Sequence, residues 1–281
     1  MAEDSDQFSR VVTGLVRRMA PTRPALRERL AVISGEDELL LGAIAGRNAE
    51  AVAGWVATHD PARLGAMAGA AGLSACFGQE GEDLIIARLL GDREPGAFAD
   101  IGAHHPIRYS NTFALYCRGW RGVNADATPG SAEAFRRLRP RDVTVEAAVS
   151  DRGGFLKIHL FETPALNTAD PDLASRYVAE GWKKIGEAEV PAVGLAELLD
   201  RHLPSGRSFD LLSVDVEGGE MGVLRSNDWD RFRPELLAIE VLDVPLSEVG
   251  SAEPIAFLGE RGYEPVSKLV QSVILRREDL G

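Results

Sequence analysis

The sequence predicts an α/β fold in which a mostly parallel sheet is wound on both faces by helices. Short apolar segments alternate with amphipathic segments that have the spacing of helices, a pattern that favours parallel strands joined by right-handed crossovers. The predicted core strands are residues 97–101, 121–126, 209–215 and 236–240. Two further extended segments, at residues 263–269 and 272–276, are typical of a hairpin. They predict an antiparallel edge to the sheet.

The stretch from residue 96 to residue 126 is predicted to hold a small ligand. It begins with the strand at residues 97–101 and a turn at Gly102, and it ends with a second strand whose last residue is Asp126. Ligands of such units bind at the carboxyl ends of the strands, and an acid after the second strand grips ribose hydroxyls. The turn lacks the three-glycine spacing of dinucleotide sites, and it contains no Gly-Lys-Ser/Thr for ATP phosphates. A ligand with a ribose but no pyrophosphate fits this turn, and S-adenosylmethionine is the candidate.

The rest of the domain is predicted to add strands outside the central ones. A third strand is expected at residues 142–149, where the sequence is DVTVEAAV. Residues 155–161 alternate between apolar and polar side chains, which indicates an extra strand. An insertion at residues 167–189 precedes a short extended piece at residues 189–193. Helices are predicted at residues 129–138, 195–202, 221–225 and 252–262.

Residues 1–72 are predicted to form a helical extension that precedes the α/β domain at residues 73–281. Apolar residues such as Phe8, Val11 and Leu15 recur at the three-and-four spacing of a helix face. The segment carries no convincing catalytic set. It is interpreted as a cap or as an arm for a homodimer, with a lid over the substrate as the alternative.

Composition limits the partners and the compartment. The formal net charge of −12 argues against a broad nucleic-acid surface, because such surfaces neutralise phosphates with Lys and Arg. Two cysteines make neither a disulfide framework nor a metal knuckle, and they fit a reducing cytoplasm. The acidic N-terminus has no signal-peptide run, and no segment approaches the ~20 apolar residues of a membrane span. We therefore expect a cytoplasmic protein with no nucleic-acid partner and no membrane span.

Four motifs that occur in order resemble those of the FkbM family of S-adenosylmethionine-dependent methyltransferases. They are FGQEGEDLII, FADIGAHHPIRYSNTFALY, GWRGVNADATP and DLLSVDVEGGEMGVLRS. The resemblance covers residues 77–277, with Phe77 standing where the family commonly has serine. It implies a Rossmann-like class I methyltransferase fold and methyl transfer, most often to oxygen. The implied acceptors include sugars and natural-product hydroxyls, so the expected partner is a small molecule or a glycan.

The cofactor is expected to bind along the first three strand ends. Asp100 and Gly102 form the turn, where glycine lets the backbone approach the methionine part of the cofactor. Asp126 accepts hydrogen bonds from the ribose hydroxyls, and Ala148, at the end of the third strand, flanks adenine. A bare turn and a solvent-exposed acid are the alternatives. By family position, two more residues are expected at the cofactor's amino-acid end or, alternatively, as helix caps: Gln79 and Asn111.

Two histidines are candidates for proton transfer. His104 and His105 lie in the loop after the first strand, at the mouth of the predicted crevice. An unperturbed histidine pKa of about 6.5 suits a group that takes the acceptor proton. A structural or merely exposed histidine is the alternative for each.

Three acids are predicted to converge on the crevice. Asp215 and Glu217 follow one apolar strand, and Glu240 ends the next. Carboxylates that repel one another need a proton or a cation between them, and hard oxygen ligands suit Mg²⁺ or Ca²⁺. A metal held by Asp215 and Glu240 would bind the acceptor hydroxyl and lower its pKa. The metal-free alternative uses Asp215 or a histidine as the base, while Glu217 binds acceptor or cofactor.

Aromatic residues in the insertion are candidates for covering the acceptor. Tyr177, Trp182 and Lys183 lie there, and aromatic faces stack on sugar rings, although local core packing is the alternative. Two rival functions stay open from the sequence. One is an NAD-type oxidoreductase, which the missing glycines disfavour. The other is a catalytically silent scaffold that acts through its helical arm.

Overall fold

The computed structural model describes residues 49–59, 61 and 76–280. The helices predicted within residues 1–48 and 62–72 lie outside the described residues, and the domain boundary at residue 72 stays a prediction. The chain divides into two compact units. One comprises the described residues up to Arg88 together with Ile107–Gly119, and the other comprises Leu89–Pro106 and the chain from Trp120 onward. Every helix within the described residues is too short or too polar to cross a lipid bilayer.

The first unit contains α4 (Ala49–Val56), α7 (Phe113–Cys117) and most of α6 (Glu82–Leu90). Ser110 caps α7, because its Oγ accepts a hydrogen bond from the Phe113 backbone N–H at 3.1 Å. The ring of Phe77 meets the ring of Phe113 edge to face at 4.8 Å between centroids. These contacts tie the predicted entry motif to the helix that follows the first strand.

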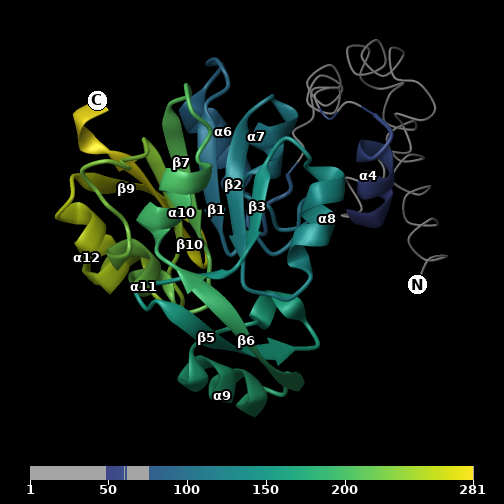
Figure 1. Cartoon of the computed structure of the whole chain (residues 1–281). Coiled ribbons are helices and arrows are strands. Elements are labelled where there is room, and N and C mark those ends of the chain that lie inside the picture. The colour runs from purple at the N-terminus through teal and green to yellow at the C-terminus, as the bar shows by residue number, and fades with distance from the viewer. Residues whose placement is uncertain (1–48, 60, 62–75, 281) are drawn as a thin grey trace, which may run out of the picture. The chain divides into compact units, whose positions relative to one another are not determined.

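The second unit is built on a seven-stranded sheet with the order β3-β2-β1-β7-β8-β10-β9 (Figure 1). The strands are β1 (Ala97–Ile101), β2 (Arg121–Asp126), β3 (Val143–Glu146), β7 (Phe209–Val214), β8 (Leu236–Glu240), β9 (Tyr263–Lys268) and β10 (Ser272–Arg277). Within this sheet, the neighbouring strands β3, β2, β1, β7 and β8 are parallel. Strand β10 runs antiparallel to both β8 and β9. The predicted mostly parallel sheet with an antiparallel edge is therefore confirmed.

Helices of this unit pack on both faces of the sheet. They are α8 (Ser131–Leu138), α10 (Leu195–His202), α11 (Glu220–Arg225) and α12 (Glu253–Gly259). Buried residues of α10, α11 and α12 share one apolar cluster with strand residues such as Ala99 and Leu212. On the opposite face, Arg139, directly after α8, stacks over Phe98 at 5.3 Å and pairs with Asp142 at 2.7 Å. Alternate residues of the parallel strands thus face two separate helical layers, which explains why the central strands β1, β7 and β8 are mostly apolar.

The third predicted strand is wrong as a single element. Residues 143–146 form β3 at the edge of the main sheet, but Ala148–Val149 form β4 in a second, three-stranded sheet. The chain changes sheets at Ala147, whose N–H donates to the Asp126 carbonyl at 3.0 Å. Both pieces are extended and rich in small or β-branched residues, so the sequence pattern does not mark the break.

The second sheet has the order β4-β6-β5 and, with α9, forms what we call the inserted module (residues 148–193). Its long strands are β5 (Gly154–Phe161) and β6 (Lys184–Val193), which pair antiparallel along their whole length. The extended piece predicted at residues 189–193 was therefore too short. The helix α9 (Pro171–Ala179) begins after Asp170, whose carboxylate accepts from the N–H groups of Asp172 and Leu173. Figure 1 shows β5, β6 and α9 gathered together below the main sheet.

Candidate active site

The turn after β1 is built around Gly102. Its N–H and that of Ala103 both donate to the Ala125 carbonyl, at 2.8 and 3.1 Å. Gly102 has φ +80°, and a Cβ at this position would lie 1.6 Å from the backbone oxygen of Asp215. Glycine is therefore required by the close approach of the chain after β7, which the sequence alone did not indicate. The role of Gly102 and Asp100 toward the cofactor stays a prediction.

Asp126 joins the loops that follow β1 and β2. One carboxylate oxygen accepts from the His104 N–H and the other from the Thr128 N–H, both at 2.7 Å. The residue is 7% exposed. A carboxylate has about four acceptor sites, so two bonds leave capacity for ribose hydroxyls. The arrangement fits the predicted ribose role and shows a second one, the alignment of both loops.

Both predicted histidines lie in the loop after β1, which Asp126 holds through the His104 N–H. His104 has a left-handed backbone, with φ +49°, and its ring centroid lies 6.4 Å from that of His105.

Ala148, which was predicted to flank adenine, packs with Ile158 and Val190 in the core of the inserted module. Its side chain therefore serves the module, and any contact with adenine would come from neighbouring backbone.

The two residues assigned to the cofactor's amino-acid end belong to the first unit. Gly78, next to Gln79, lies against Asn111, because a Cβ on Gly78 would come 3.3 Å from the Asn111 Oδ1. The structure thus brings the neighbourhood of Gln79 and Asn111 together. Their role toward a cofactor stays a prediction.

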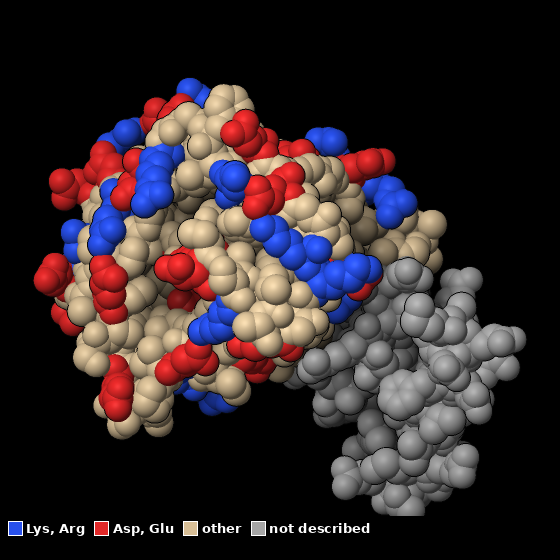
Figure 2. Space-filling model, turned by 90° about the horizontal axis from the view of Figure 1, so that it is seen from below, with Lys and Arg blue, Asp and Glu red and all other residues tan. Residues whose placement is uncertain are grey.

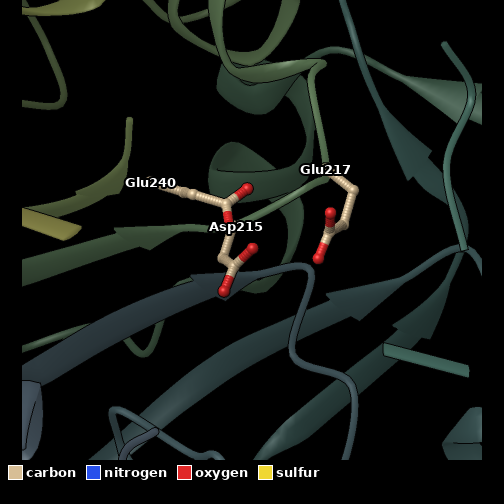
Figure 3. A group of neighbouring side chains, drawn as sticks. All are labelled: Asp215, Glu217 and Glu240. Atoms are coloured by element: carbon tan, nitrogen blue, oxygen red, sulfur yellow. The ribbon is translucent and has the colours of Figure 1, made fainter. Parts of the chain in front are cut away.

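The three predicted acids do converge, and we call Asp215, Glu217 and Glu240 the acid cluster. Glu240 ends β8, which pairs in parallel with β7, and Asp215 directly follows β7. One carboxylate oxygen of each residue lies within 4.8 Å of the others (Figure 3). Because parallel strands finish at the same edge of a sheet, adjacent strand ends bring these side chains together.

Burial dominates the electrostatics of the acid cluster. It raises the pKa of Asp215 well above its ordinary value, raises the pKa of Glu217 to about 7 and raises the pKa of Glu240 to about 11. The negative charges of neighbouring acids add to each shift. A hydrogen bond between the side chains of Asp215 and Glu240 lowers the pKa of Asp215 and raises that of Glu240.

Asp215 combines an accessible surface with strong desolvation, whereas Glu240 is only 8% exposed. Figure 2 shows acidic side chains at a hollow in this side of the molecule, while acidic and basic residues are interspersed over the rest of the face. Asp215 is thus the member of the acid cluster that a small molecule can reach.

The inserted module supports Glu217 in a way the sequence did not predict. The Tyr177 hydroxyl donates to the Glu217 Oε2, and the Thr168 hydroxyl donates to the Glu217 carbonyl at 2.6 Å. Glu217 itself has φ +54°, a conformation that costs energy unless its surroundings hold it. Glu220 Oε1 accepts from the N–H groups of Val216 and Gly218, at 3.2 and 3.1 Å. The loop that carries Glu217 is therefore fastened from both sides.

The other two residues assigned to acceptor binding lie elsewhere on the module. Trp182 is 45% exposed, and Lys183 forms an exposed ion pair with Glu162 at 2.9 Å. Of the three, Tyr177 alone is placed by these contacts against the acid cluster. The sequence does not predict its contact with Glu217, because the two residues lie 40 positions apart.

We expect Glu217→Gln to stabilise the cation-free protein at pH 8 more than at pH 4.5. The folded pKa of Glu217 is raised from 4.5 to about 7, so its contribution to stability is complete below pH 4.5 and is lost as pH rises through about 7. Glutamine removes the charge, and its amide oxygen can still accept from Tyr177. The gain in unfolding free energy, measured by urea denaturation, should be about 2 kcal/mol larger at pH 8 than at pH 4.5.

Glu187→Gln is the matched control. Hydrogen bonds from Lys184 and Lys157 lower the pKa of Glu187 to about 2, so its contribution is present above pH 4.5. This variant should lose stability at pH 8 where Glu217→Gln gains it. Equal pH profiles for wild type and Glu217→Gln would contradict the raised pKa.

Comparison with known proteins assigns the chain to a family. The profile of the methyltransferase FkbM domain matches residues 100–265, more than half of the 281-residue chain. No curated protein sequence matches. Similar solved structures include a precorrin-6y C5,15-methyltransferase from Geobacter metallireducens GS-15, with 11% identity over 73% of this chain and 93% of that one, at a TM-score of 0.37. Another is a TehB-like SAM-dependent methyltransferase from Corynebacterium glutamicum ATCC 13032, with 11% identity over 77% and 95% of the two chains, at a TM-score of 0.37. On the match over residues 100–265, this chain belongs to the FkbM methyltransferase domain family.

Proposed function

We propose that the protein is an S-adenosylmethionine-dependent O-methyltransferase whose acceptor is a hydroxyl group of a sugar or another natural product. Membership of the FkbM family supports the methyl transfer and the cofactor. The observation that carries the proposal is the contact between Gly102 and the Asp215 backbone, where a Cβ on glycine would overlap the Asp215 oxygen. The predicted cofactor turn and the acid cluster therefore meet at one edge of the sheet.

The residues present fit this cofactor at the ribose position. Asp126 is a buried carboxylate at the end of β2 with acceptor capacity left over from its two backbone bonds. S-adenosylmethionine, when bound, supplies an electrophilic methyl group. The chain would bind its ribose through Asp126, hold the acceptor in the hollow and exclude water, and such positioning can supply much of the rate.

The general base that removes the proton from the acceptor hydroxyl would be a residue of the acid cluster or a histidine. Asp215 is exposed and would take the proton on a carboxylate oxygen, while His104 and His105 are the alternatives in the loop after β1. Glu217 would orient the acceptor. Mg²⁺ enters the proposal as a second cofactor at Asp215 and Glu240, where it would lower the pKa of the acceptor hydroxyl.

Calorimetric titration and a labelled-methyl assay test the proposal. The protein should bind S-adenosylmethionine or S-adenosylhomocysteine and should not bind NAD, since its turn lacks the dinucleotide glycines. Affinity for NAD alone would end the methyltransferase proposal. Incubation with methyl-labelled cofactor and a panel of glycans and natural-product alcohols should then label a hydroxyl oxygen. Label found only on nitrogen would keep the methyltransferase and refute the O-methyl part.

Two further parts of the proposal rest on the sequence. Residues 1–72 would mediate a homodimer, and the two cysteines of the chain fit a reducing cytoplasm. Sedimentation of the full chain beside a chain that begins at residue 73 tests the first.

A further inference from the structure

We propose that the acid cluster is a three-carboxylate site for one Mg²⁺ ion, in which Glu217 is the third protein ligand and Tyr177 is the residue that positions it. The inference rests on the proposed function and deepens it, because the ion would bind next to the acceptor hydroxyl. It differs from a site of Asp215 and Glu240 alone, since it makes the inserted module part of the site.

The spacing of the carboxylates is that of ligands around a single ion. One oxygen from each of Asp215, Glu217 and Glu240 lies within 4.8 Å of the others. Two oxygens on opposite sides of one Mg²⁺ or Ca²⁺ lie about 4–5 Å apart, because each is about 2.0–2.6 Å from the ion. The three oxygens can therefore contact one ion with small side-chain adjustments.

A second observation, independent of the clustering, concerns one atom of Glu240. Its Oε2 is buried and has no hydrogen-bond partner, although the residue is only 8% exposed. Leaving a buried polar atom without a partner costs about 1–3 kcal/mol, so such atoms in native proteins need an explanation. Among the described residues, no Lys or Arg side chain hydrogen-bonds to any carboxylate of the acid cluster; Arg176, which lowers the pKa of Glu217, pairs with Asp243 at 2.9 Å. A cation would satisfy Glu240 Oε2 and offset the repulsion among the three acids.

Tyr177 explains how Glu217 is available as a ligand. The phenol donates to Oε2 of Glu217, which leaves Oε1 for an ion. The Tyr177 ring is itself fixed, since it meets the Phe161 ring edge to face at 5.7 Å. Thr168 holds the Glu217 carbonyl, so side chains of the module fasten both the backbone and the carboxylate of this ligand.

The site is open to solvent at Asp215, which is exposed. Mg²⁺ commonly keeps several water ligands when carboxylates hold it. An acceptor hydroxyl could replace one of these waters and so lie against both the ion and Asp215. Through Tyr177, the inserted module would then set the geometry of the ion as well as cover the acceptor.

Mn²⁺, which electron paramagnetic resonance detects, serves as the probe for Mg²⁺. The full chain is titrated with Mn²⁺ alone, without cofactor or acceptor, and the bound ion is then displaced with Mg²⁺. We expect one ion per chain. Asp215→Asn and Glu240→Gln should each weaken binding by at least about 30-fold, and Tyr177→Phe by about 5- to 10-fold with an altered spectrum of the bound ion.

Two control variants isolate the roles of charge and of the hydroxyl group. Tyr263→Phe removes a buried hydroxyl whose bond goes to the Pro234 carbonyl, before the start of β8 and at the opposite end of that strand from Glu240. Asp170→Asn removes an acid from the N-cap of α9, where asparagine also caps well. Both controls should bind Mn²⁺ like the wild type, and thermal melts establish that every variant is folded.

Several outcomes would overturn the inference. Absence of Mn²⁺ binding at millimolar concentration refutes the ion site, as does binding that survives both Asp215→Asn and Glu240→Gln. Binding by Tyr177→Phe equal to that of the wild type refutes the positioning role. If Glu240→Gln fails to fold, Glu217→Gln takes its place, and the anomalous signal of Mn²⁺ in crystals locates the ion directly. Since the titration contains neither cofactor nor acceptor, failure here leaves methyl transfer untouched, and lack of cofactor binding leaves this result intact.

Discussion

Asp215→Asn is expected to reduce methyl transfer by about 10³-fold while the protein stays folded and binds S-adenosylhomocysteine with an affinity within about threefold of the wild type. Asparagine keeps the shape of the side chain but neither takes a proton nor carries the charge that holds a cation. Its backbone contact with Gly102 is unchanged by the substitution. The measurements are the turnover number on the acceptor found with labelled cofactor, and calorimetric titration with S-adenosylhomocysteine.

The same substitution should not lower the thermal stability of the protein, although it lowers turnover. Desolvation and neighbouring negative charges raise the pKa of Asp215, so the ionised form destabilises the folded protein. Asp215→Asn should therefore melt at the same temperature as the wild type at neutral pH, or at a higher one. Asp170→Asn, the same chemical change outside the acid cluster, should leave turnover unchanged. Turnover by Asp215→Asn above a tenth of the wild-type value would remove Asp215 from the mechanism.

The acid cluster could be predicted from the sequence because its assembly depends on strand ends alone. Asp215 follows β7 and Glu240 ends β8, and neighbouring parallel strands finish at one edge of a sheet. The same reasoning placed Asp126 at the end of β2, next to β1. Periodicity and topology are sufficient for such residues, since each lies within one or two positions of an apolar strand.

The contacts of the inserted module could not be predicted in this way. Tyr177 reaches Glu217 across 40 positions, and Thr168 reaches it across 49, from a segment whose pattern indicated only an insertion. Strand β6 has one buried residue in ten and contains Pro191, so its sequence lacks the alternation that marks a half-buried strand. The break at Ala147 could not be predicted either, because no Gly, Pro, Asn or Asp marks a turn between Val143 and Val149.

Gly102 has a structural reason to be glycine that the sequence did not indicate. A glycine after a central strand indicates a tight turn, and approach to a ligand is one common cause. The structure shows another cause that needs no ligand. The Asp215 N–H donates to the Ile101 carbonyl at 2.9 Å, which brings the chain after β7 against Gly102.

Gly102→Ala is accordingly expected to cost about 2–5 kcal/mol of unfolding free energy, or to prevent folding. A left-handed backbone costs a non-glycine residue about 1–2 kcal/mol, and overpacking adds about 1–3 kcal/mol. Here φ is +80°, and the new Cβ would lie 1.6 Å from the oxygen and 2.6 Å from the carbonyl carbon of Asp215. Both obstacles are backbone atoms, so no side chain can rotate away to relieve the clash. Urea denaturation of the wild type and the variant measures the difference.

Gly130→Ala separates the two contributions and so completes the argument. Gly130 has φ +84°, but a Cβ there would have no atom within 4 Å, so the left-handed backbone is the only cost of alanine at this position. It should lose about 1–2 kcal/mol, clearly less than Gly102→Ala. Equal losses for the two variants would mean that the chain after β7 can move away from the turn. In that event the acid cluster would not be held at the cofactor edge by backbone packing, and the contact that carries the proposed function would lose its force.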